Sequence, residues 1–295
     1  MDAQRIGTLL IIFSALSFAT FPIFIKFTFT YGISVTTMLA FRFLGAAIIM
    51  WSVIWLQGIP ARVSRRSLIH LILMGAVGYG TMSSLYSSSL HYISASMTAM
   101  LLYLYPVIVS ILSYLLGDET FDHRRLVALM ISLCGLFLVL GTTFENLSSY
   151  GVLLASGAAF VYSGYIVCGN RLLKEISPFV TTAYITLSAS IAFFAIGLFT
   201  GSMQVNLPPT GWLLLFLIAL IPTVFAILTF FAGMARIGPG KASIISTLEP
   251  VGTVVLSAWL LGERFTLNQL AGGLLVLGGV ILLQLWKAPA TDTEG

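Results

Sequence analysis

Residues 101–106 read LLYLYP and residues 245–250 read ISTLEP. Both stretches lie inside long apolar runs, and their prolines, Pro106 and Pro250, are 144 positions apart. Proline has no backbone N–H and clashes with the preceding helical turn, so each run is predicted to be a helix that kinks at its proline. The same interrupted helix is therefore predicted twice in one chain, as in an internal repeat.

The repetition extends well beyond these two stretches. Between Ile93–Leu140 and Ile237–Gln284, 13 of 48 positions are identical without a gap. The identities pair Pro106 with Pro250, Ser113 with Ser257, Glu119 with Glu263, Phe121 with Phe265 and Gly135 with Gly279. Shared apolar composition would not place a proline, a glutamate and a glycine in one register. We predict two repeats, residues 1–143 and 144–288, and a short disordered tail, residues 289–295.

Composition places the chain in a membrane. Of its 295 residues 58% are hydrophobic and 8% are charged, and the mean hydropathy is +1.03, whereas soluble domains carry about 25% charged residues. A membrane-spanning helix needs about 20 apolar residues. Ten segments qualify, at approximately 6–27, 34–56, 69–89, 95–116, 125–142, 151–170, 179–200, 211–232, 241–261 and 267–286. The expected fold is an all-α polytopic membrane protein with ten transmembrane helices.

Lysines and arginines predict the orientation, because they are enriched in cytoplasmic loops. A cytoplasmic N-terminus leaves only Lys26 and Arg264 outside, and Arg42 lies within a span. The remaining eleven of the fourteen basic residues then lie inside, namely Arg5, Arg62, Arg65, Arg66, Arg124, Arg125, Arg171, Lys174, Arg236, Lys241 and Lys287. We expect a multi-pass protein of the inner (plasma) membrane with both termini in the cytoplasm. Five spans per repeat is an odd number, so the second repeat is inverted.

Inverted repeats are typical of carriers that work by alternating access, with the binding site between the halves near the midplane. Two-fold symmetry that serves only packing, or that builds a channel, is the alternative. The predicted connections are too short for a soluble domain or an ATP-binding module, so transport would depend on gradients.

Several motifs together resemble one family. The arginine in AFRFLGAA (residues 40–47) and the paired segments LLGDETF (residues 115–121) and LLGERF (residues 260–265) are similar to the EamA family of the drug/metabolite transporter superfamily. The resemblance implies a ten-helix carrier, commonly a metabolite exporter. Within the superfamily the chain is most similar to the YddG-type exporters of aromatic and other neutral amino acids.

Aromatic and hydroxyl side chains at helical spacing mark a candidate substrate cavity. Tyr79, Ser83 and Tyr86 form one stripe, and Tyr162 and Tyr165 share another helix face. The 144-residue offset maps the second face onto Phe18 and Phe21, and maps the first stripe onto Thr223, Ile227 and Phe230. Tyrosines also gather at membrane interfaces, but these four lie well inside their spans.

The two kinks add further candidates. A kink frees carbonyls near residues 102 and 246, which need a protein or water partner in a membrane. Tyr103 and Tyr105 would point about 200° apart on a regular helix, so we expect only one to face the cavity and prefer Tyr103, which the repeat pairs with Thr247. The alternative is a kink that only improves packing.

Glu249 and Arg42 are ionisable residues within spans, where a functional role is the first hypothesis. Glu249 would neutralise a substrate ammonium, carry a coupled proton, pair with Arg42, or cap the kink while protonated. Arg42 has no charged counterpart in the other repeat, where Thr186 occupies its position.

Other classes of function lack the residues they need. An intramembrane enzyme requires a nucleophile and a base or metal ligands, and no buried histidine or aspartate is predicted. We expect no metal, no cofactor and no nucleic-acid partner. The two cysteines, Cys134 and Cys168, are expected to be buried thiols. Gly272 and Gly279 share a helix face suited to close packing or a dimer contact, so the chain is expected to be a monomer or weak homodimer.

The sequence therefore predicts a carrier in the lipid bilayer for a small neutral or zwitterionic substrate with an apolar part, resembling an amino acid. Aromatic rings would stack on the substrate and hydroxyls would bind its polar end. The resemblance adds amino acids and export. Export of drugs or other metabolites, and a channel-like pore, are the alternatives.

Overall fold

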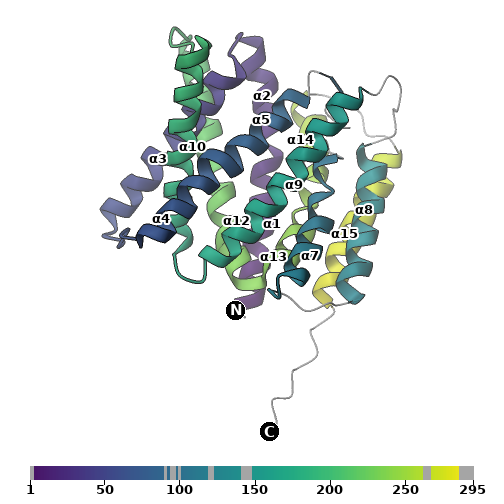
Figure 1. Cartoon of the computed structure of the whole chain (residues 1–295). Coiled ribbons are helices and arrows are strands. Elements are labelled where there is room, and N and C mark those ends of the chain that lie inside the picture. Colours follow the sequence, from purple (N-terminus) through teal and green to yellow (C-terminus); the bar gives the residue numbers. More distant parts are fainter. Residues whose placement is uncertain are drawn as a thin grey trace.

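The computed structural model describes residues 3–89, 92–93, 98, 101–118, 123–140, 148–261 and 267–285. Every regular element in these ranges is a helix, and the helices lie side by side in one bundle (Figure 1). In chain order they are α1 (Ala3–Ala19), α2 (Phe21–Thr30), α3 (Val35–Leu56), α4 (Arg65–Ile72), η1 (Leu73–Tyr79), α5 (Gly80–Ser89), α7 (Tyr105–Leu115), α8 (His123–Leu140), α9 (Ser149–Leu172), α10 (Pro178–Thr200), α11 (Pro209–Ala219), η2 (Leu220–Phe225), α12 (Ala226–Ile237), α13 (Pro239–Ile245), α14 (Leu248–Leu261) and α15 (Leu267–Leu285). The all-α class predicted from the sequence is confirmed for these residues.

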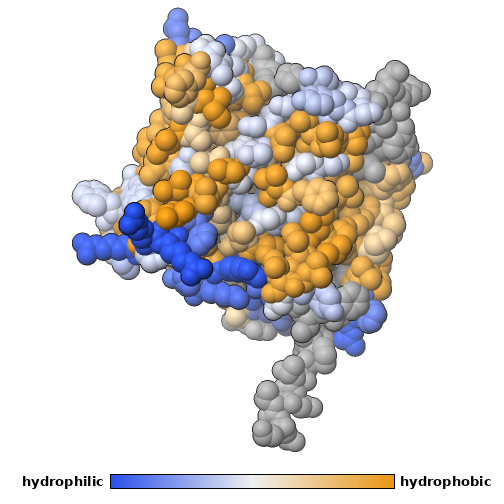
Figure 2. Space-filling view, viewed as in Figure 1, coloured by the Kyte–Doolittle hydropathy of each residue, from blue (hydrophilic) through white to orange (hydrophobic). Residues whose placement is uncertain are grey.

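Much of the outer surface is apolar. Phe199 is 92% exposed and Trp55 is 81% exposed. Figure 2 shows hydrophobic side chains over most of the visible face, with hydrophilic ones gathered mainly along its lower edge. Six helical runs in the described residues are long and apolar enough to cross a membrane: Ala3–Ile25, Val35–Leu56, Arg65–Ser89, Ser149–Leu172, Pro178–Thr200 and Pro209–Ile237. Three shorter apolar helices, Tyr105–Leu115, Leu126–Leu138 and Leu270–Leu282, accompany them. An apolar surface of this extent is suited to contact with lipid.

Serine residues set the start of several helices. Ser34 precedes α3 in an extended conformation and its hydroxyl accepts a hydrogen bond from the Thr37 N–H. Ser177 caps α10 in the same way through the Val180 N–H. Each cap satisfies one of the N–H groups that a helix leaves unpaired at its first turn. The caps fix where two helices begin that pack against each other in the bundle.

The main helix contacts follow the sequence repeat. The most extensive packing joins α8 to α15 and α3 to α10, and in each pair the 144-residue offset superposes one helix on the other. Next come α1 with α12 and α5 with α9. The 144-residue offset relates α1 to α9 and α5 to α12. The α1–α12 contact and the α5–α9 contact are therefore equivalent under the repeat.

Individual glycine contacts repeat in the same way. A Cβ atom added to Gly135 on α8 would lie 2.6 Å from the Gly272 carbonyl oxygen on α15. One added to Gly279 on α15 would lie 2.8 Å from the Ala128 carbonyl oxygen on α8. Gly272 and Ala128 are themselves 144 positions apart. Small residues let these helix backbones approach closely, as at many membrane helix interfaces.

A second pair of glycines shows the same correspondence. A Cβ atom on Gly7 would lie 2.9 Å from the Arg236 Cβ, and one on Gly151 would lie 2.8 Å from the Tyr92 Cβ. Arg236 and Tyr92 are again 144 positions apart. The α1–α12 contact and the contact of α9 with the chain after α5 therefore use related residues.

Two long helices contain a π-helical segment. In η1 the Gly80 N–H bonds to the carbonyls of Gly75 and Val77, and in η2 the Ala226 N–H bonds to those of Ile221 and Thr223. Neither N–H group bonds to the carbonyl four residues earlier, which is its partner in a regular α-helix. The offset moves residues 73–79 onto 217–223, which overlaps η2 (220–225). Such segments re-aim backbone carbonyls and frequently lie at functional sites.

The helices that contain the two kink prolines are both interrupted. Residues 103–104 form a turn before α7, and Ser246 and Thr247 form a turn between α13 and α14. The Ser246 carbonyl accepts the Glu249 N–H at 3.0 Å. The expectation that this carbonyl is left free at the kink is therefore wrong, because a tighter turn supplies its donor. Pro106 and Pro250 are both buried.

Candidate functional site

Arg42 lies in the middle of α3 with only 2% of its surface exposed. Its Nε donates to Thr223 Oγ1 at 2.6 Å, and its Nη2 donates to the Pro222 carbonyl at 3.0 Å and to the Tyr79 hydroxyl at 3.4 Å. All three acceptors are neutral and lie on the two π segments. Arg42 forms no ion pair with Glu249, one of the sequence-based hypotheses, among the described residues; it bonds to neutral groups, and the Glu249 carboxyl group lies within electrostatic reach of it.

Pro222 explains why the arginine finds acceptors inside a helix. Since proline has no N–H, the Ile218 carbonyl loses its usual donor, and the Thr223 hydroxyl donates to it instead at 2.7 Å. The hydroxyl oxygen then accepts from Arg42. The Ala226 N–H bonds to the carbonyls of Ile221 and Thr223 and not to that of Pro222. The Pro222 carbonyl therefore also lacks its usual helical donor, and it accepts from Arg42.

Aromatic rings enclose the guanidinium. Its carbon Cζ lies 4.0 Å from the centre of the Phe21 ring, 5.0 Å from that of Phe43 and 5.9 Å from that of Tyr79. Cation–π contacts of this kind stabilise a cation away from water. They bring Phe21 and Tyr79, two residues predicted to line the site, to the same group.

A continuous run of tyrosines leads away from Arg42. The ring of Tyr79 lies 5.3 Å from that of Tyr165, which is stacked at 5.9 Å on Tyr162. Tyr162 lies 4.8 Å from Tyr105, and Tyr105 lies 5.7 Å from Tyr103. We call these five residues the tyrosine run. It joins η1, α9 and the start of α7 through the interior.

The tyrosine run contains polar atoms with no partner. The hydroxyls of Tyr103 and Tyr165 are fully buried and make no hydrogen bond of ordinary geometry within the described part of the chain. The Glu249 carboxyl group on α14 neighbours the Tyr103 hydroxyl. An unsatisfied buried polar group costs ~1–3 kcal/mol. The Tyr165 hydroxyl, next to Tyr79 in the run, thus offers unused hydrogen-bonding capacity, whereas the Tyr103 hydroxyl has the Glu249 carboxyl group beside it.

The remaining predicted residues lie around this centre. Phe230 is buried against Phe231 (6.1 Å between rings), which in turn lies 5.9 Å from Tyr165. Tyr86 is half-buried and lies within electrostatic reach of Glu249. Thr247 is buried and donates to the Ile244 carbonyl at 2.7 Å. Ser83 is buried and Phe18 half-buried, and neither has a ring contact or side-chain hydrogen bond to the tyrosine run in the described residues.

Sequence reasoning missed three members of the site. The geometry of a regular helix favours Tyr103 over Tyr105, but the turn at 103–104 breaks that geometry, and both tyrosines are buried in the run. Phe231 joins Phe230 to the run. Pro222 supplies a carbonyl to Arg42, and a proline inside the apolar run of residues 211–232 was its available signal.

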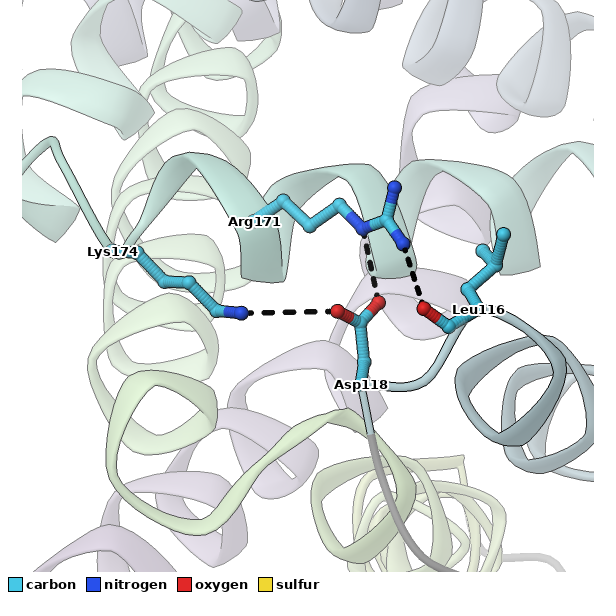
Figure 3. A network of polar contacts seen from close by, with 4 residues as sticks. All are labelled: Leu116, Asp118, Arg171 and Lys174. Atoms are coloured by element: carbon cyan, nitrogen blue, oxygen red, sulfur yellow. Dashed lines mark hydrogen bonds and ion pairs between the residues drawn. The ribbon is translucent and has the colours of Figure 1, made fainter.

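A second polar cluster lies at one end of the bundle (Figure 3). Asp118, just after α7, accepts from Arg171 Nε at 3.0 Å and lies 3.7 Å from Lys174 Nζ. Arg171 also donates to the Leu116 carbonyl at 3.3 Å, at the C-terminus of α7. Gly117, with a φ of 72°, allows the Asp118 N–H to bond back to the Ser113 carbonyl, which holds the carboxylate in place.

Metal and thiol chemistry find no support in the described residues. They contain no group of three or more histidine, cysteine, aspartate or glutamate side chains that could hold a metal ion. Cys134 and Cys168 are free and exposed, so the expectation of buried thiols is wrong. Both lie on outward faces of apolar helices, where a weakly polar thiol is tolerated beside lipid.

Comparison with known proteins gives the family. The model of the EamA-like transporter family matches the chain twice, over residues 5–141 and 149–285. Similar proteins include the uncharacterized transporter YyaM of Bacillus subtilis (27% identical; 95% of this chain and 94% of that one) and the uncharacterized inner membrane transporter YicL of Salmonella typhimurium (27%; 75% of each). A solved crystal structure has the same fold, with a TM-score of 0.82 at 19% identity, over 95% of this chain and 97% of that one. The chain belongs to the EamA-like transporter family.

Proposed function

We propose that this membrane transporter is a secondary carrier that exports small neutral or zwitterionic metabolites, foremost aromatic and other neutral amino acids, by alternating access. The YddG-type exporters are the members of the drug/metabolite transporter superfamily that it most resembles in this respect. The carrier has ten transmembrane helices in two inverted repeats, residues 1–143 and 144–288, with both termini in the cytoplasm. It works in the inner membrane as a monomer or weak homodimer, with no cofactor.

The repeat arrangement is supported by three observations. The family model matches each half separately. Helices related by the 144-residue offset pack in reciprocal pairs. Two arginines, Arg124 and Arg125, follow the first LLG motif and one, Arg264, follows the second, the difference that the positive-inside rule predicts for an inverted second repeat. An odd number of spans in each repeat accounts for this inversion.

The observation that carries the proposal is the tyrosine run with its unpaired polar atoms. It is buried between elements of both halves, as a midplane site of an inverted-repeat carrier would be. Rings such as Tyr162 and Tyr165 offer flat apolar faces to an aromatic side chain. The unpartnered hydroxyl of Tyr165 offers a hydrogen bond to a polar end. One buried cation and one carboxylate suit a zwitterion with little net charge.

Counterflow in proteoliposomes tests the function. Purified protein is reconstituted, the vesicles are preloaded with one unlabelled amino acid, and uptake of labelled phenylalanine is followed. Faster uptake with phenylalanine, tyrosine or leucine inside than with empty vesicles is the expected result, since a carrier returns faster when loaded. Protein-free vesicles and vesicles preloaded with glutamate are the controls.

The alternatives give different outcomes in the same assay. A channel-like pore would pass phenylalanine without saturation and without stimulation from the opposite side. An exporter of drugs or other metabolites would give no phenylalanine flux even when the reconstituted protein is monodisperse. Flux of the substrate of such an exporter would instead be inhibited by members of a panel of unlabelled lipophilic compounds. Either result would overturn the amino-acid proposal and leave membership of the transporter family intact.

A further inference from the structure

We propose that Arg42, through its Nη1 amino group, and the Tyr165 hydroxyl form a receptor for a single carboxylate group of the transported molecule. This inference rests on the proposed function in that it names how the same site takes its substrate. It requires the substrate to be a carboxylic acid and not merely an aromatic or lipophilic compound.

Three of the groups around Arg42 fix its side chain before any ligand arrives. Thr223 and Pro222 take Nε and Nη2, and Phe21 covers the face of the guanidinium. Nη1 and its two N–H donors have no hydrogen-bond partner in the described part of the chain. A donor edge that is already oriented binds a planar acceptor without the cost of ordering a flexible arginine.

No ion pair neutralises Arg42 in this structure, and Glu249 is the carboxylate of the described residues that lies within its electrostatic reach. The described part of the chain contains three carboxylates, Asp118, Glu175 and Glu249, and none forms an ion pair with Arg42. Asp118 pairs with Arg171 and Lys174. A cation within a membrane is costly without an anion bound to it, so an anionic group bound at Nη1 stabilises Arg42.

Tyr165 supplies a second donor in the neighbourhood of Arg42. Its hydroxyl is buried without a partner, its ring lies 5.3 Å from Tyr79, the tyrosine that Arg42 contacts, and Arg42 and Tyr165 lie within electrostatic reach of each other. An O–H and a guanidinium edge are complementary to the two oxygens of one carboxylate.

The number of charges selects a carboxylate over a phosphate. Arg42 is the one charged side chain among the fully buried residues that the structure describes, so a dianionic phosphate would remain half-neutralised. A monoanion balances the single guanidinium. The ring faces of Tyr162 and Tyr105 then continue from the carboxylate site toward Glu249, which suits a ligand that carries an aromatic part beyond its acid group.

Thermal stabilisation of the purified carrier tests the receptor without requiring transport. The probes are phenylalanine and 3-phenylpropionate, which keep the carboxylate, and phenylalaninamide, which lacks it. Wild-type protein should be stabilised by both acids, with phenylalaninamide at least about tenfold weaker, because a charge-assisted hydrogen bond is lost. Arg42→Gln should lower the apparent affinity for both acids about tenfold or more and leave that for the amide unchanged. Tyr165→Phe should act in the same direction and less strongly.

Matched variants guard against a general defect. Arg62→Gln and Tyr150→Phe change exposed residues and should leave all three affinities as in the wild type. If Arg42→Gln does not fold, Arg42→Lys keeps the charge without the fork, and Tyr165→Phe keeps the ring. Stabilisation of the wild type by the amide equal to that by the acids, no stabilisation by any probe, or equal losses for acids and amide in these variants would each overturn the receptor. Failure of counterflow with intact acid binding would instead overturn the proposed transport.

Discussion

Tyr79 and Thr223 lie 144 positions apart in the chain and both accept a hydrogen bond from Arg42. One residue of the first repeat thus binds corresponding positions on η1 and η2. In the proposed inverted-repeat arrangement, a side chain that touches two repeat-related positions at once lies close to the axis that relates the repeats. Arg42 therefore contacts corresponding positions of both halves.

Thr223→Val should destabilise the protein, because it removes the acceptor of the Arg42 Nε without changing side-chain shape. We expect a loss of ~1–3 kcal/mol in the free energy of unfolding, the usual cost of an unsatisfied buried donor. Urea titration in detergent measures it. Thr229→Val is the control, since the Thr229 hydroxyl bonds only to the carbonyls of Phe225 and Ala226 in its own helix. Equal stability of the two variants would contradict the assigned role of Thr223.

Glu249→Gln tests whether Glu249 carries a coupled proton, one of the four roles considered for it; in that role the substitution uncouples transport from a proton gradient. An amide keeps the shape and hydrogen-bonding of the side chain near Tyr103 but cannot take up and release a proton. We expect phenylalanine counterflow within about twofold of wild type, with no stimulation of net flux by an imposed pH gradient. Glu175→Gln, at an exposed position, is the control. Gradient-driven flux that survives in Glu249→Gln would assign coupling elsewhere.

Gly135→Ala should weaken the contact of α8 with α15. The new methyl group would meet backbone atoms of Gly272 and Val276 at 2.6 Å, and backbone cannot move aside as a side chain can. Overpacking of this kind typically costs ~1–3 kcal/mol, which a lowered thermal midpoint would report. Gly278→Ala on α15 meets nothing within 4 Å and should leave the midpoint nearly unchanged. A midpoint for Gly135→Ala that matches this control would show that the helices separate easily.

Asp118→Asn should loosen the end of α7 against α9, because it removes the shared partner of Arg171 and Lys174 (Figure 3). The reporter is Ser113→Cys, a buried position on α7, in a background where Cys134 and Cys168 are alanine. We expect maleimide to label this cysteine several-fold faster when Asp118 is asparagine. Glu175→Gln, next to Lys174 in sequence, should not change the rate. Unchanged labelling in Asp118→Asn would mean that packing alone holds the two helices.

The sequence predicts those residues of the site that are of a type rare in apolar runs or that recur at the 144-residue offset. Arg42 and Glu249 stand out because ionisable residues are scarce in apolar runs, and the offset relates Tyr79 to Thr223 before any coordinates are known. The sequence does not predict the contacts that arise where a helix departs from regular geometry. The turn before α7 brings Tyr103 and Tyr105 together, although a regular helix would separate them.

The partners of Arg42 illustrate a second limit. Acceptors for a buried arginine are ordinarily sought among carboxylates, which made Glu249 the natural candidate. Here they are a hydroxyl and a carbonyl that Pro222 and a π segment free from their usual helical donors. The residue types in a sequence do not show which backbone carbonyls lack a helical donor, so these acceptors can be identified only from the local helical geometry.

The reciprocal glycine contacts have a thermodynamic consequence for a carrier that alternates between two states. If the halves exchange conformations, the contact of Gly135 with Gly272 becomes that of Gly279 with Ala128 and the reverse, so α8 and α15 contribute equally to both states. The Asp118 cluster has no such twin, since the offset replaces Asp118, Arg171 and Lys174 by Gly262, Phe27 and Thr30. In the proposed alternation, symmetric contacts of this kind contribute no energy difference between the two states, whereas an asymmetric cluster such as these three charges favours one of them.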